Sequence, residues 1–234
     1  MSVALITGAS RGLGHAVGVA LGRRGWSLVV DARTSADLTA AAEAFRTAGA
    51  EQVTAIAGSV AEPEHRAQLR DAVKTLGDLD LLVNNASALG PSPQPGLASY
   101  PLEVFEQVYA VNVTAPLALT QELLPSLRAA HGRIVNITSD AAVEPLAEWG
   151  GYGSSKAALE QLTAILGAEE GDLRVFAFDP GDMRTVMHQQ AFPDEDISDR
   201  PEAESVVPAL LRLVDDALPS GRYQASALLA GAAA

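Results

Sequence analysis

The sequence of 234 residues contains no cysteine, which excludes a disulfide scaffold, a thiolate nucleophile and a cysteine metal site. Basic residues are also scarce, because 16 lysines and arginines face 29 aspartates and glutamates, for a formal net charge of -13. Nucleic acids and anionic membranes are bound through basic surfaces. We therefore expect neither a nucleic acid nor a membrane as a partner.

Long apolar segments are missing as well. The stretch from Leu13 to Leu21 is too short to span a bilayer and is followed by two arginines. The chain runs from its first residues directly into the apolar stretch Val3–Ile6, with no basic region and no cleavage-type spacer. Together with the absence of cysteine, these features favour a cytoplasmic protein.

The sequence also lacks the spacings that are typical of metal ligands. The histidines are scattered and show no H-E-x-x-H pattern, and the acidic run 194–196 lacks the alternating ligands and the glycine of a calcium loop. We predict no metal site and expect all the histidines at the surface or in loops, with His188 as a candidate for a substrate loop. They are His15, His65, His131 and His188.

Short apolar runs alternate with longer segments that have a helical pattern. Most runs are continuous, as in parallel strands that are covered on both faces. The repetition predicts an α/β fold: one domain over residues 1–234, with a Rossmann-type doubly wound sheet of about seven parallel strands and helices on both faces. The expected strands are Val3–Thr7, Ser27–Asp31, Gln52–Ala57, Asp80–Val83, Arg133–Thr138, Arg174–Phe178 and Tyr223–Leu229, and the expected helices include Ala36–Ala48, Glu64–Leu76, Leu102–Ala130 and Ser154–Ala168.

Two segments are expected to be long loops, the proline-rich segment 88–101 and the segment 181–203. In an open α/β sheet, ligands bind beyond the carboxyl ends of the strands. Loops that leave those ends are therefore candidate walls of a substrate site.

A glycine-rich turn follows the first expected strand directly. Its glycines are Gly8, Gly12 and Gly14, with the spacing G-x-x-x-G-x-G. Glycine permits a tight turn and a close approach of the main chain to a ligand, and the amino end of the following helix favours negative charge. The turn predicts a nucleotide site in which a pyrophosphate meets main-chain N–H groups.

Tyr152 and Lys156 stand four residues apart, so on a helix they share a face. A nearby cation favours the phenolate and is expected to lower the pKa of Tyr152 from its usual value of about 10. Such a phenol suits proton exchange with an alcohol or a carbonyl. Ser139 follows an apolar run, at the expected carboxyl end of a strand, where its hydroxyl can hold a substrate oxygen.

In this order, the motifs resemble those of the classical short-chain dehydrogenases/reductases over nearly the whole chain. The segment Thr7–Gly14 is similar to the cofactor turn of that family, and Asn84-Asn85-Ala86 is similar to its structural N-N-A-G. Pro180-Gly181, followed by Thr185, is similar to the loop that holds the nicotinamide carboxamide. Four residues match the family's catalytic tetrad: Asn112, Ser139, Tyr152 and Lys156.

The resemblance implies that the chain interconverts a carbonyl and an alcohol with a nicotinamide cofactor. Tyr152 would be the proton donor in reduction and the base in oxidation, and Lys156 would lower its pKa and bind the nicotinamide ribose. Ser139 would orient the substrate oxygen, and Asn112 would hold a water in the proton relay. The residues expected to contact the dinucleotide are Gly8, Ser10, Arg11, Gly12, Leu13, Gly14, Arg33, Ser59, Val60, Asn85, Ala86, Tyr152, Lys156, Pro180, Gly181 and Thr185.

The resemblance also bears on which nicotinamide cofactor is used. NAD-dependent members carry an acidic residue seven positions after the glycine that corresponds to Gly25, whereas this sequence has Ala32 there and Arg33 next. A guanidinium can clamp a 2′-phosphate bidentately, and Arg11 matches a basic residue common in NADP-preferring relatives. We therefore expect NADP(H) to be preferred. Asp31 keeps NAD(H) open, because a shift of one residue would place it on the adenosine ribose.

Two positions depart from the family pattern. Ser87 replaces the last glycine of N-N-A-G, and Ser59 stands where relatives carry an aspartate that touches the adenine. The resemblance further implies a small-molecule ketone, aldehyde or alcohol as the substrate, and a homodimer or homotetramer. The alternatives are an NAD(H)-dependent alcohol dehydrogenase and a non-catalytic regulator that senses the dinucleotide.

Overall fold

Seven strands and nine α-helices lie within residues 2–231, which are the residues that the computed structural model describes. The strands are β1 (Val3–Ile6), β2 (Ser27–Ala32), β3 (Val53–Ala57), β4 (Leu81–Asn84), β5 (Arg133–Ile137), β6 (Arg174–Asp179) and β7 (Gly221–Gln224). The helices are α1 (Gly12–Arg23), α2 (Ser35–Ala48), α3 (Pro63–Leu76), α4 (Leu102–Tyr109), α5 (Ala115–Ala130), α6 (Gly150–Glu169), α7 (Val186–Ala191), α8 (Val207–Asp215) and α9 (Ala225–Ala230). Short 3-10 turns cover Leu97–Ser99, Asp140–Ala142 and Ala203–Val206, and a π turn covers Ala110–Thr114.

The strands form one parallel sheet in the order β3-β2-β1-β4-β5-β6-β7. In this register Leu5 of β1 pairs with Val29 of β2 on one side and with Leu82 of β4 on the other. The direction of winding reverses between β1 and β4, and ligands of open α/β sheets bind beyond the carboxyl ends of strands at such a point. The predicted fold class, including the seven parallel strands, is confirmed.

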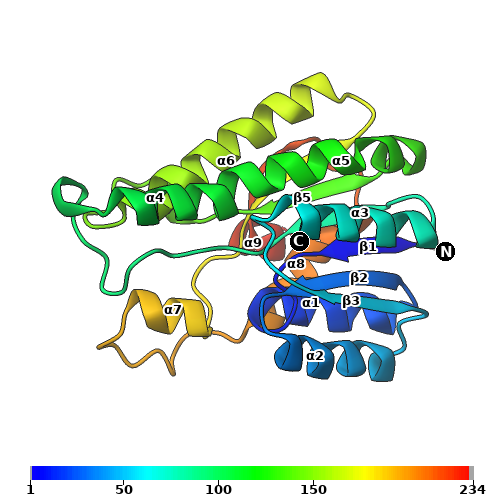
Figure 1. Cartoon of the computed structure of the whole chain (residues 1–234), viewed down its shortest axis with the longest axis horizontal. Helices are drawn as coiled ribbons and strands as arrows, with labels where there is room; N and C mark the ends of the chain where they lie inside the picture. The colour runs from blue at the N-terminus through cyan, green and yellow to red at the C-terminus, as the bar shows by residue number, and fades with distance from the viewer. Residues whose placement is uncertain (1, 232–234) are drawn as a thin grey trace.

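Helices cover both faces of the sheet (Figure 1). Helices α1, α2, α8 and α9 pack on one face, in a core that includes Val17, Phe45 and Leu210. Helices α3 and α5 pack on the other face, around Leu69 and Leu123. Strands β1, β2 and β4 are buried along their whole length, as expected for parallel strands that are covered on both faces. Among the described helices, none is long and apolar enough to cross a membrane.

Three elements differ from the prediction. The segment 181–203, expected to be a long loop, contains the short helix α7, which the Thr185 side chain caps. The expected strand Tyr223–Leu229 is divided, because β7 ends at Gln224 and the rest belongs to α9. The sequence of α9 contains only alanine, leucine and serine, and without a β-branched residue it favours helix over strand. The expected helix Leu102–Ala130 is interrupted by the π turn between α4 and α5. Pro116 has no N–H to donate to the carbonyl of Asn112, so a regular α-helix cannot continue there.

Candidate active site

A cavity of about 720 Å³ opens at the carboxyl ends of the strands, beside the reversal of strand order. Two of the predicted site residues, Gly14 and Asn112, lie behind its wall. The other predicted residues line it, and they are Gly8, Ser10, Arg11, Gly12, Leu13, Arg33, Ser59, Val60, Asn85, Ala86, Ser139, Tyr152, Lys156, Pro180, Gly181 and Thr185. The fold therefore brings the cofactor motifs and the tyrosine–lysine pair to one cavity.

The glycine turn has a main chain that can receive an anion. Gly8 has a φ of +66°, and a side chain there would come within 2.9 Å of the Cα of Ala86. A side chain at Gly14 would come within 2.5 Å of the Asn85 amide nitrogen. No described side chain caps α1, and its first turn contains no acidic residue, so its first N–H groups are open to a ligand. These features fit the pyrophosphate of a dinucleotide.

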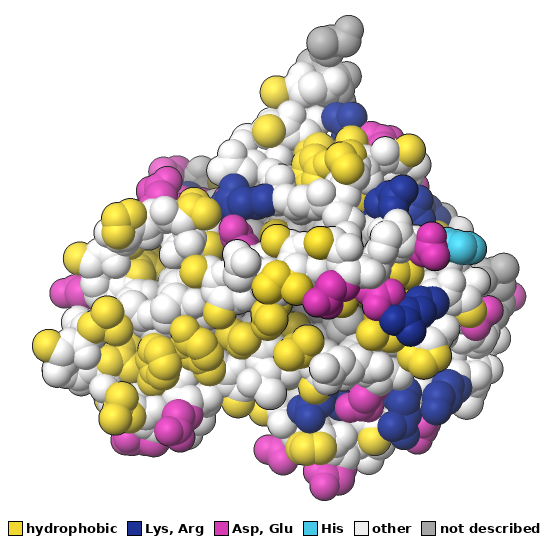
Figure 2. All heavy atoms as spheres, turned by 90° about the horizontal axis from the view of Figure 1, so that it is seen from above, with side chains coloured by type: hydrophobic (Ala, Val, Ile, Leu, Met, Phe, Trp, Pro, Cys, Tyr) yellow, Lys and Arg dark blue, Asp and Glu magenta, His cyan; other side chains and the backbone are white. Residues whose placement is uncertain are grey.

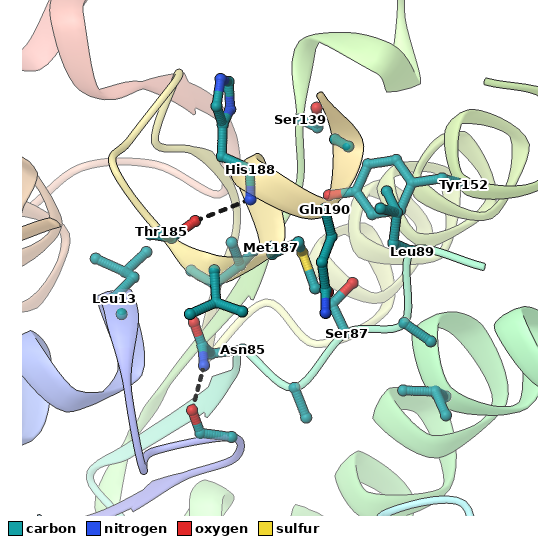
Figure 3. Close-up of a pocket in the computed structure, with 18 of the residues that line it drawn as sticks. Leu13, Asn85, Ser87, Leu89, Ser139, Tyr152, Thr185, Met187, His188 and Gln190 are labelled. Atoms are coloured by element: carbon teal, nitrogen blue, oxygen red, sulfur yellow. Dashed lines mark hydrogen bonds between the residues drawn. The ribbon is translucent and has the colours of Figure 1, made fainter. Parts of the chain in front are cut away.

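Asn85 holds the glycine turn from the side of β4. Its amide nitrogen donates to the main-chain oxygens of Thr7 at 2.8 Å and Gly8 at 3.0 Å, and Figure 3 draws one of these bonds. The N–H groups of Asn85 and Ala86 both donate to the Thr7 hydroxyl at 3.0 Å. The loop after β4 and the turn after β1 are thus tied together where the strand order reverses.

Asp31 and His65 form a buried pair below the glycine turn. Asp31 is 1% exposed and His65 is 5% exposed, and the Nε2 of His65 lies 2.9 Å from the Oδ2 of Asp31. The Oδ1 of Asp31 accepts a hydrogen bond of 2.7 Å from the N–H of Gly8. The carboxylate is therefore held under the turn rather than free to meet a ribose. The expectation that every histidine lies at the surface or in a loop is wrong for His65, which belongs to α3 and fills the space beside Gly58.

Arg11 and Arg33 are the free cations at this end of the cavity. Both residues are exposed and line the cavity. Within residues 2–231, neither guanidinium has a hydrogen-bond or ion-pair partner. Arg33 follows β2, the strand that carries Asp31, so an open cation and an engaged carboxylate stand two residues apart at one strand end. This arrangement fits an adenosine that carries a 2′-phosphate.

The loop after β6 closes the cavity from the other side. Its Gly181 has a φ of +70° and donates its N–H to the Oδ1 of Asp179 at 3.0 Å. The Thr185 hydroxyl caps α7 by accepting from the N–H of His188 at 3.2 Å (Figure 3). A side chain at Gly12 would meet the Thr185 methyl at 3.5 Å, so this loop reaches the glycine turn. It therefore bridges the two ends of the cavity.

Tyr152 and Lys156 are both buried on α6, with the lysine nitrogen 5.4 Å from the centre of the tyrosine ring. Burial raises the pKa of Tyr152 to about 12, and the charges of Asp140 and Asp179 add to this shift. Burial also lowers the pKa of Lys156 to about 8. The structure thus differs from the expected lowering of the Tyr152 pKa, because desolvation disfavours the charged form of both side chains. The ammonium donates to the carbonyl of Ile137 at 2.8 Å.

The hydroxyls of Ser87, Ser139 and Tyr152 lie in this part of the cavity. The two serine hydroxyls donate their protons to acceptors within the protein. Ser139 donates to the Oδ1 of Asp140 at 2.7 Å. Ser87 donates to the Oδ1 of Asn112 at 3.2 Å. The polar Ser87 and Ser139 hydroxyls oppose the burial-driven rise in the pKa of Tyr152. The phenolic proton of Tyr152 is therefore the one most readily given to a substrate.

Asn112 lies in the π turn between α4 and α5 and is 1% exposed. Its Oδ1 accepts from the Ser87 hydroxyl and from the N–H of Ala88. Its Nδ2 donates to the carbonyl of Ala88 and to the hydroxyl of Ser155, each at 2.9 Å. These four bonds use the whole capacity of a carboxamide. A relay water would therefore have to bind the main-chain carbonyl of Asn112, which Pro116 leaves without its usual α-helical donor.

Arg222 of β7 ties the ends of two strands to α6. Its guanidinium contacts Glu160 of α6 at 2.9 Å and Asp179 of β6 at 2.9 Å. Thr138, at the end of β5, donates to the same Glu160 at 2.7 Å. The network fixes the strand ends that carry Ser139 and the loop after β6. Burial lowers the pKa of Arg222, but its hydrogen bonds and the charges of both carboxylates more than offset this and raise it.

The end of the cavity beyond Tyr152 is apolar. Leu89 and Tyr152 pack with Trp149 and Met187, and Trp149 lies 5.6 Å from Phe192 between ring centres. Figure 3 shows the side chains of Met187 and Gln190 pointing from α7 into the cavity. Among the described lining residues from α4, α6 and α7, the only lysine or arginine is Lys156. Arg184, in the loop before α7, also lines the cavity but pairs with Glu202. Within the described residues, this end therefore offers no unpaired arginine to an anionic substrate.

Three residues of this site have contacts that sequence reasoning does not predict. The only indication of Ser87 in the sequence is that a polar residue stands where the family has glycine. Asp140 and Arg222 do not belong to any of the sequence motifs described above. The partners of Arg222, Glu160 and Asp179, lie 62 and 43 positions away along the chain, so only the folded sheet brings them together.

Comparison with known proteins identifies related chains for most of the sequence. The family described as short chain dehydrogenase matches residues 2–196. Benzil reductase ((S)-benzoin forming) of Bacillus subtilis is 32% identical over 193 residues, 80% of this chain and 76% of that protein. A short chain dehydrogenase structure from Pseudomonas syringae has a TM-score of 0.90 at 34% identity and covers 96% of this chain and 94% of its own. Another from Shigella flexneri, complexed with NADP, has a TM-score of 0.89 at 29% identity and covers 96% and 97%.

Proposed function

Because the chain belongs to the short-chain dehydrogenase/reductase family and is thus an NAD(P)-dependent oxidoreductase, we propose that it reduces uncharged ketones or aldehydes with NADPH. The reverse reaction oxidises the corresponding alcohol. The observation that carries the proposal is one continuous cavity, with free arginines at one end and Ser139, Tyr152 and Lys156 at the other. The first end suits a phosphorylated dinucleotide, and the second suits proton exchange with a carbonyl.

The preference for NADP(H) is supported by the end of β2. An acidic residue that binds the adenosine ribose would favour NAD(H), but both oxygens of Asp31 are engaged by Gly8 and His65. Arg11 and Arg33 are exposed and open to a 2′-phosphate. The related structure from Shigella flexneri is a complex with NADP. These contacts of Asp31 count against the alternative of an NAD(H)-dependent alcohol dehydrogenase, which would need this carboxylate on the adenosine ribose.

The chemistry follows from the three hydroxyls and the buried lysine. NADPH, when bound, supplies the hydride that adds to the carbonyl carbon. Tyr152 donates its phenolic proton to the carbonyl oxygen, and Ser139 orients that oxygen from the end of β5. Lys156 binds the nicotinamide ribose, and its charge favours the phenolate that the proton transfer leaves. Asn112 fixes the active-site loop after β4, and its main-chain carbonyl holds the relay water.

The substrate is an uncharged carbonyl compound with an apolar or aromatic group. Trp149, Met187 and Phe192 provide an apolar wall beside Tyr152. Asp140 adds a carboxylate next to Ser139, and a negative charge there disfavours an anionic substrate. The relative from Bacillus subtilis is named as a reductase of benzil, which is a neutral aryl ketone.

Self-association as a homodimer or homotetramer is part of the proposal. Leu117 of α5 and Ile165 of α6 are large apolar side chains exposed to solvent. Figure 2 shows apolar side chains gathered on the face above α4, α5 and α6. Exposed apolar patches often mark protein contacts. Sedimentation equilibrium should give at least twice the mass of 24.2 kDa, and a particle of 24.2 kDa would contradict this part of the proposal.

The experiment that tests the function is NADPH oxidation by the purified protein with a matched set of carbonyl compounds. Methyl benzoylformate and benzoylformate share one aryl ketone and differ in charge, and benzil provides a larger neutral substrate. We expect turnover of benzil and of the ester, with little turnover of the carboxylate. NADH is run beside NADPH and should support a lower kcat/KM.

Each outcome decides a different part of the proposal. Equal turnover of the ester and the carboxylate would remove the argument for an uncharged substrate. A higher kcat/KM with NADH would reverse the cofactor preference. Silence with every neutral ketone and aldehyde and both cofactors, together with tight NADPH binding, would favour the dinucleotide-sensing regulator instead.

A further inference from the structure

Arg222 contacts the ends of two strands that serve different parts of the proposed reaction. Strand β5 leads to Ser139, and β6 ends at Asp179, where the loop that closes the cavity begins. One Nη atom of Arg222 donates to the Oδ2 of Asp179 at 2.9 Å and lies 3.4 Å from the carbonyl oxygen of Ser139. Its Nε donates to the Oε1 of Glu160 at 2.9 Å, and this oxygen also accepts from the Thr138 hydroxyl at 2.7 Å. One planar guanidinium therefore spans both strand ends.

Asp179 transmits the contact with Arg222 to the main chain of the loop after β6. The residue is 3% exposed and lies in the wall of the cavity. Its Oδ2 accepts from Arg222, while its Oδ1 accepts the N–H of Gly181 at 3.0 Å. Within residues 2–231, Arg222 is the only ion-pair partner of this carboxylate. A buried carboxylate that loses its partner is strongly disfavoured, so without the arginine we expect Asp179 to turn toward water and release Gly181.

We propose that Arg222 is a positioning residue, which holds Ser139 and the loop after β6 in the relative positions that the reaction requires. This inference rests on the proposed function, in which Ser139 orients the substrate oxygen and the loop is similar to the one that holds the nicotinamide. The guanidinium makes and breaks no covalent bond. A misplacement of about 1 Å between reacting groups can lower a rate by about a hundredfold. A lysine would keep the charge but lacks the planar fork that reaches two carboxylates at once.

The first test measures the position of the loop without cofactor or turnover. Two glycine amides of the protein donate to aspartate oxygens, Gly181 to Asp179 at 3.0 Å and Gly8 to Asp31 at 2.7 Å. Their hydrogen exchange is followed by NMR in the nitrogen-15-labelled protein. In Arg222→Met we expect exchange at Gly181 to become about tenfold faster, because its acceptor moves away, while exchange at Gly8 stays unchanged.

The second test measures catalysis and cofactor binding. With the best neutral ketone, Arg222→Met should lower kcat about tenfold, and the deuterium isotope effect on kcat with labelled NADPH should increase, because hydride transfer becomes slower relative to product release. Binding of 2′-phospho-ADP-ribose, which lacks the nicotinamide, should stay unchanged. Arg222→Lys should recover only part of kcat. The control is Arg24→Met, which removes an exposed arginine paired with Asp215 at 2.9 Å and should keep the wild-type kcat.

The outcomes separate a positioning role from a purely structural one. Equal acceleration of exchange at Gly8 and Gly181 would indicate general destabilisation and would overturn the proposal. Wild-type kcat in folded Arg222→Met would do the same, and full kcat in Arg222→Lys would show that a positive charge alone is sufficient. If Arg222→Met does not fold, Arg222→Lys carries both measurements, with faster exchange at Gly181 and a reduced kcat as the expected results. Failure of the wild-type protein to turn over any carbonyl would instead refute the proposed function, and hydrogen exchange would still decide whether Arg222 holds the loop.

Discussion

The two ends of the cavity hold their positive charges in opposite ways. At the adenosine end, Arg11 and Arg33 are exposed, so water solvates them and the folded protein keeps them at little cost in stability. At the catalytic end, Lys156 is 2% exposed and, within residues 2–231, has one hydrogen bond, to the carbonyl of Ile137. Burial lowers its pKa to about 8. In the proposed function, recognition of the dinucleotide would use cations that remain in water, whereas proton chemistry would use a cation that the fold must desolvate.

The largest expected effect is that of a substitution at Tyr152, which lies at the catalytic end of the cavity, where the charged group is desolvated. Tyr152→Phe should retain affinity for NADPH, because the cofactor contacts are otherwise intact, while kcat falls at least about a hundredfold through loss of the proton donor. Stopped-flow measurement of single turnovers and fluorescence titration of NADPH separate the two quantities. Near-normal turnover in this variant would remove Tyr152 from the mechanism.

The adenosine end is tested by Arg33→Ala. We expect NADPH binding to weaken by about 1–3 kcal/mol, since a charged hydrogen bond to the 2′-phosphate is lost, with NADH binding nearly unchanged. Isothermal titration calorimetry gives both values, and Arg23→Ala, an exposed arginine in the last turn of α1, serves as the control. Equal losses for the two cofactors would show that Arg33 does not read the 2′-phosphate.

The destabilisation that results from burying the Lys156 ammonium can be measured as a change in the free energy of unfolding. Lys156→Met should raise the free energy of unfolding at pH 7 by about 1–3 kcal/mol, because a desolvated ammonium is replaced by an apolar chain of similar length. Between pH 8 and 10.5 the folded wild-type protein loses this proton while the unfolded chain keeps it, so wild-type stability rises and the difference closes. Urea denaturation at several pH values gives the curve, with the exposed Lys74→Met as the control. A variant that is less stable at pH 7 would contradict this account.

The smallest expected effect is a change in cofactor preference on substitution in the Asp31–His65 pair below the glycine turn. His65→Leu removes the partner of the Oδ2 of Asp31 and allows the carboxylate to turn toward the 2′-phosphate site. Repulsion between these anions should reduce the preference for NADPH over NADH by roughly 3- to 10-fold. The ratio of the two dissociation constants is the readout, and the exposed His131→Leu is the control. An unchanged ratio would mean that the Gly8 N–H alone is enough to hold Asp31.

The contrast between the two ends also explains what could be predicted from the sequence. The glycine turn and the Tyr152–Lys156 pair are local patterns, with members a few residues apart, and the continuous strands are recognisable from their apolar runs. The role of Asp31 was not predictable, because its partner His65 lies 34 positions away on another element. Sequence reasoning treats a nearby lysine as a cation that lowers the pKa of Tyr152. It has no measure of the burial that raises this pKa to about 12.

β7 is the last described strand along the chain, so the two ends of the cavity are synthesised at different times. The glycine turn, Asp31, Arg33 and their partners all lie at or before Ala86, whereas Arg222 belongs to the last described strand along the chain. At about 5–20 residues per second, a ribosome needs roughly 7–27 s to extend the chain from Ala86 to Arg222. The growing polypeptide therefore contains every group of the adenosine end well before the arginine that ties Ser139, Glu160 and Asp179 together. The residues of the glycine turn are therefore synthesised well before the arginine that holds the catalytic end of the cavity together.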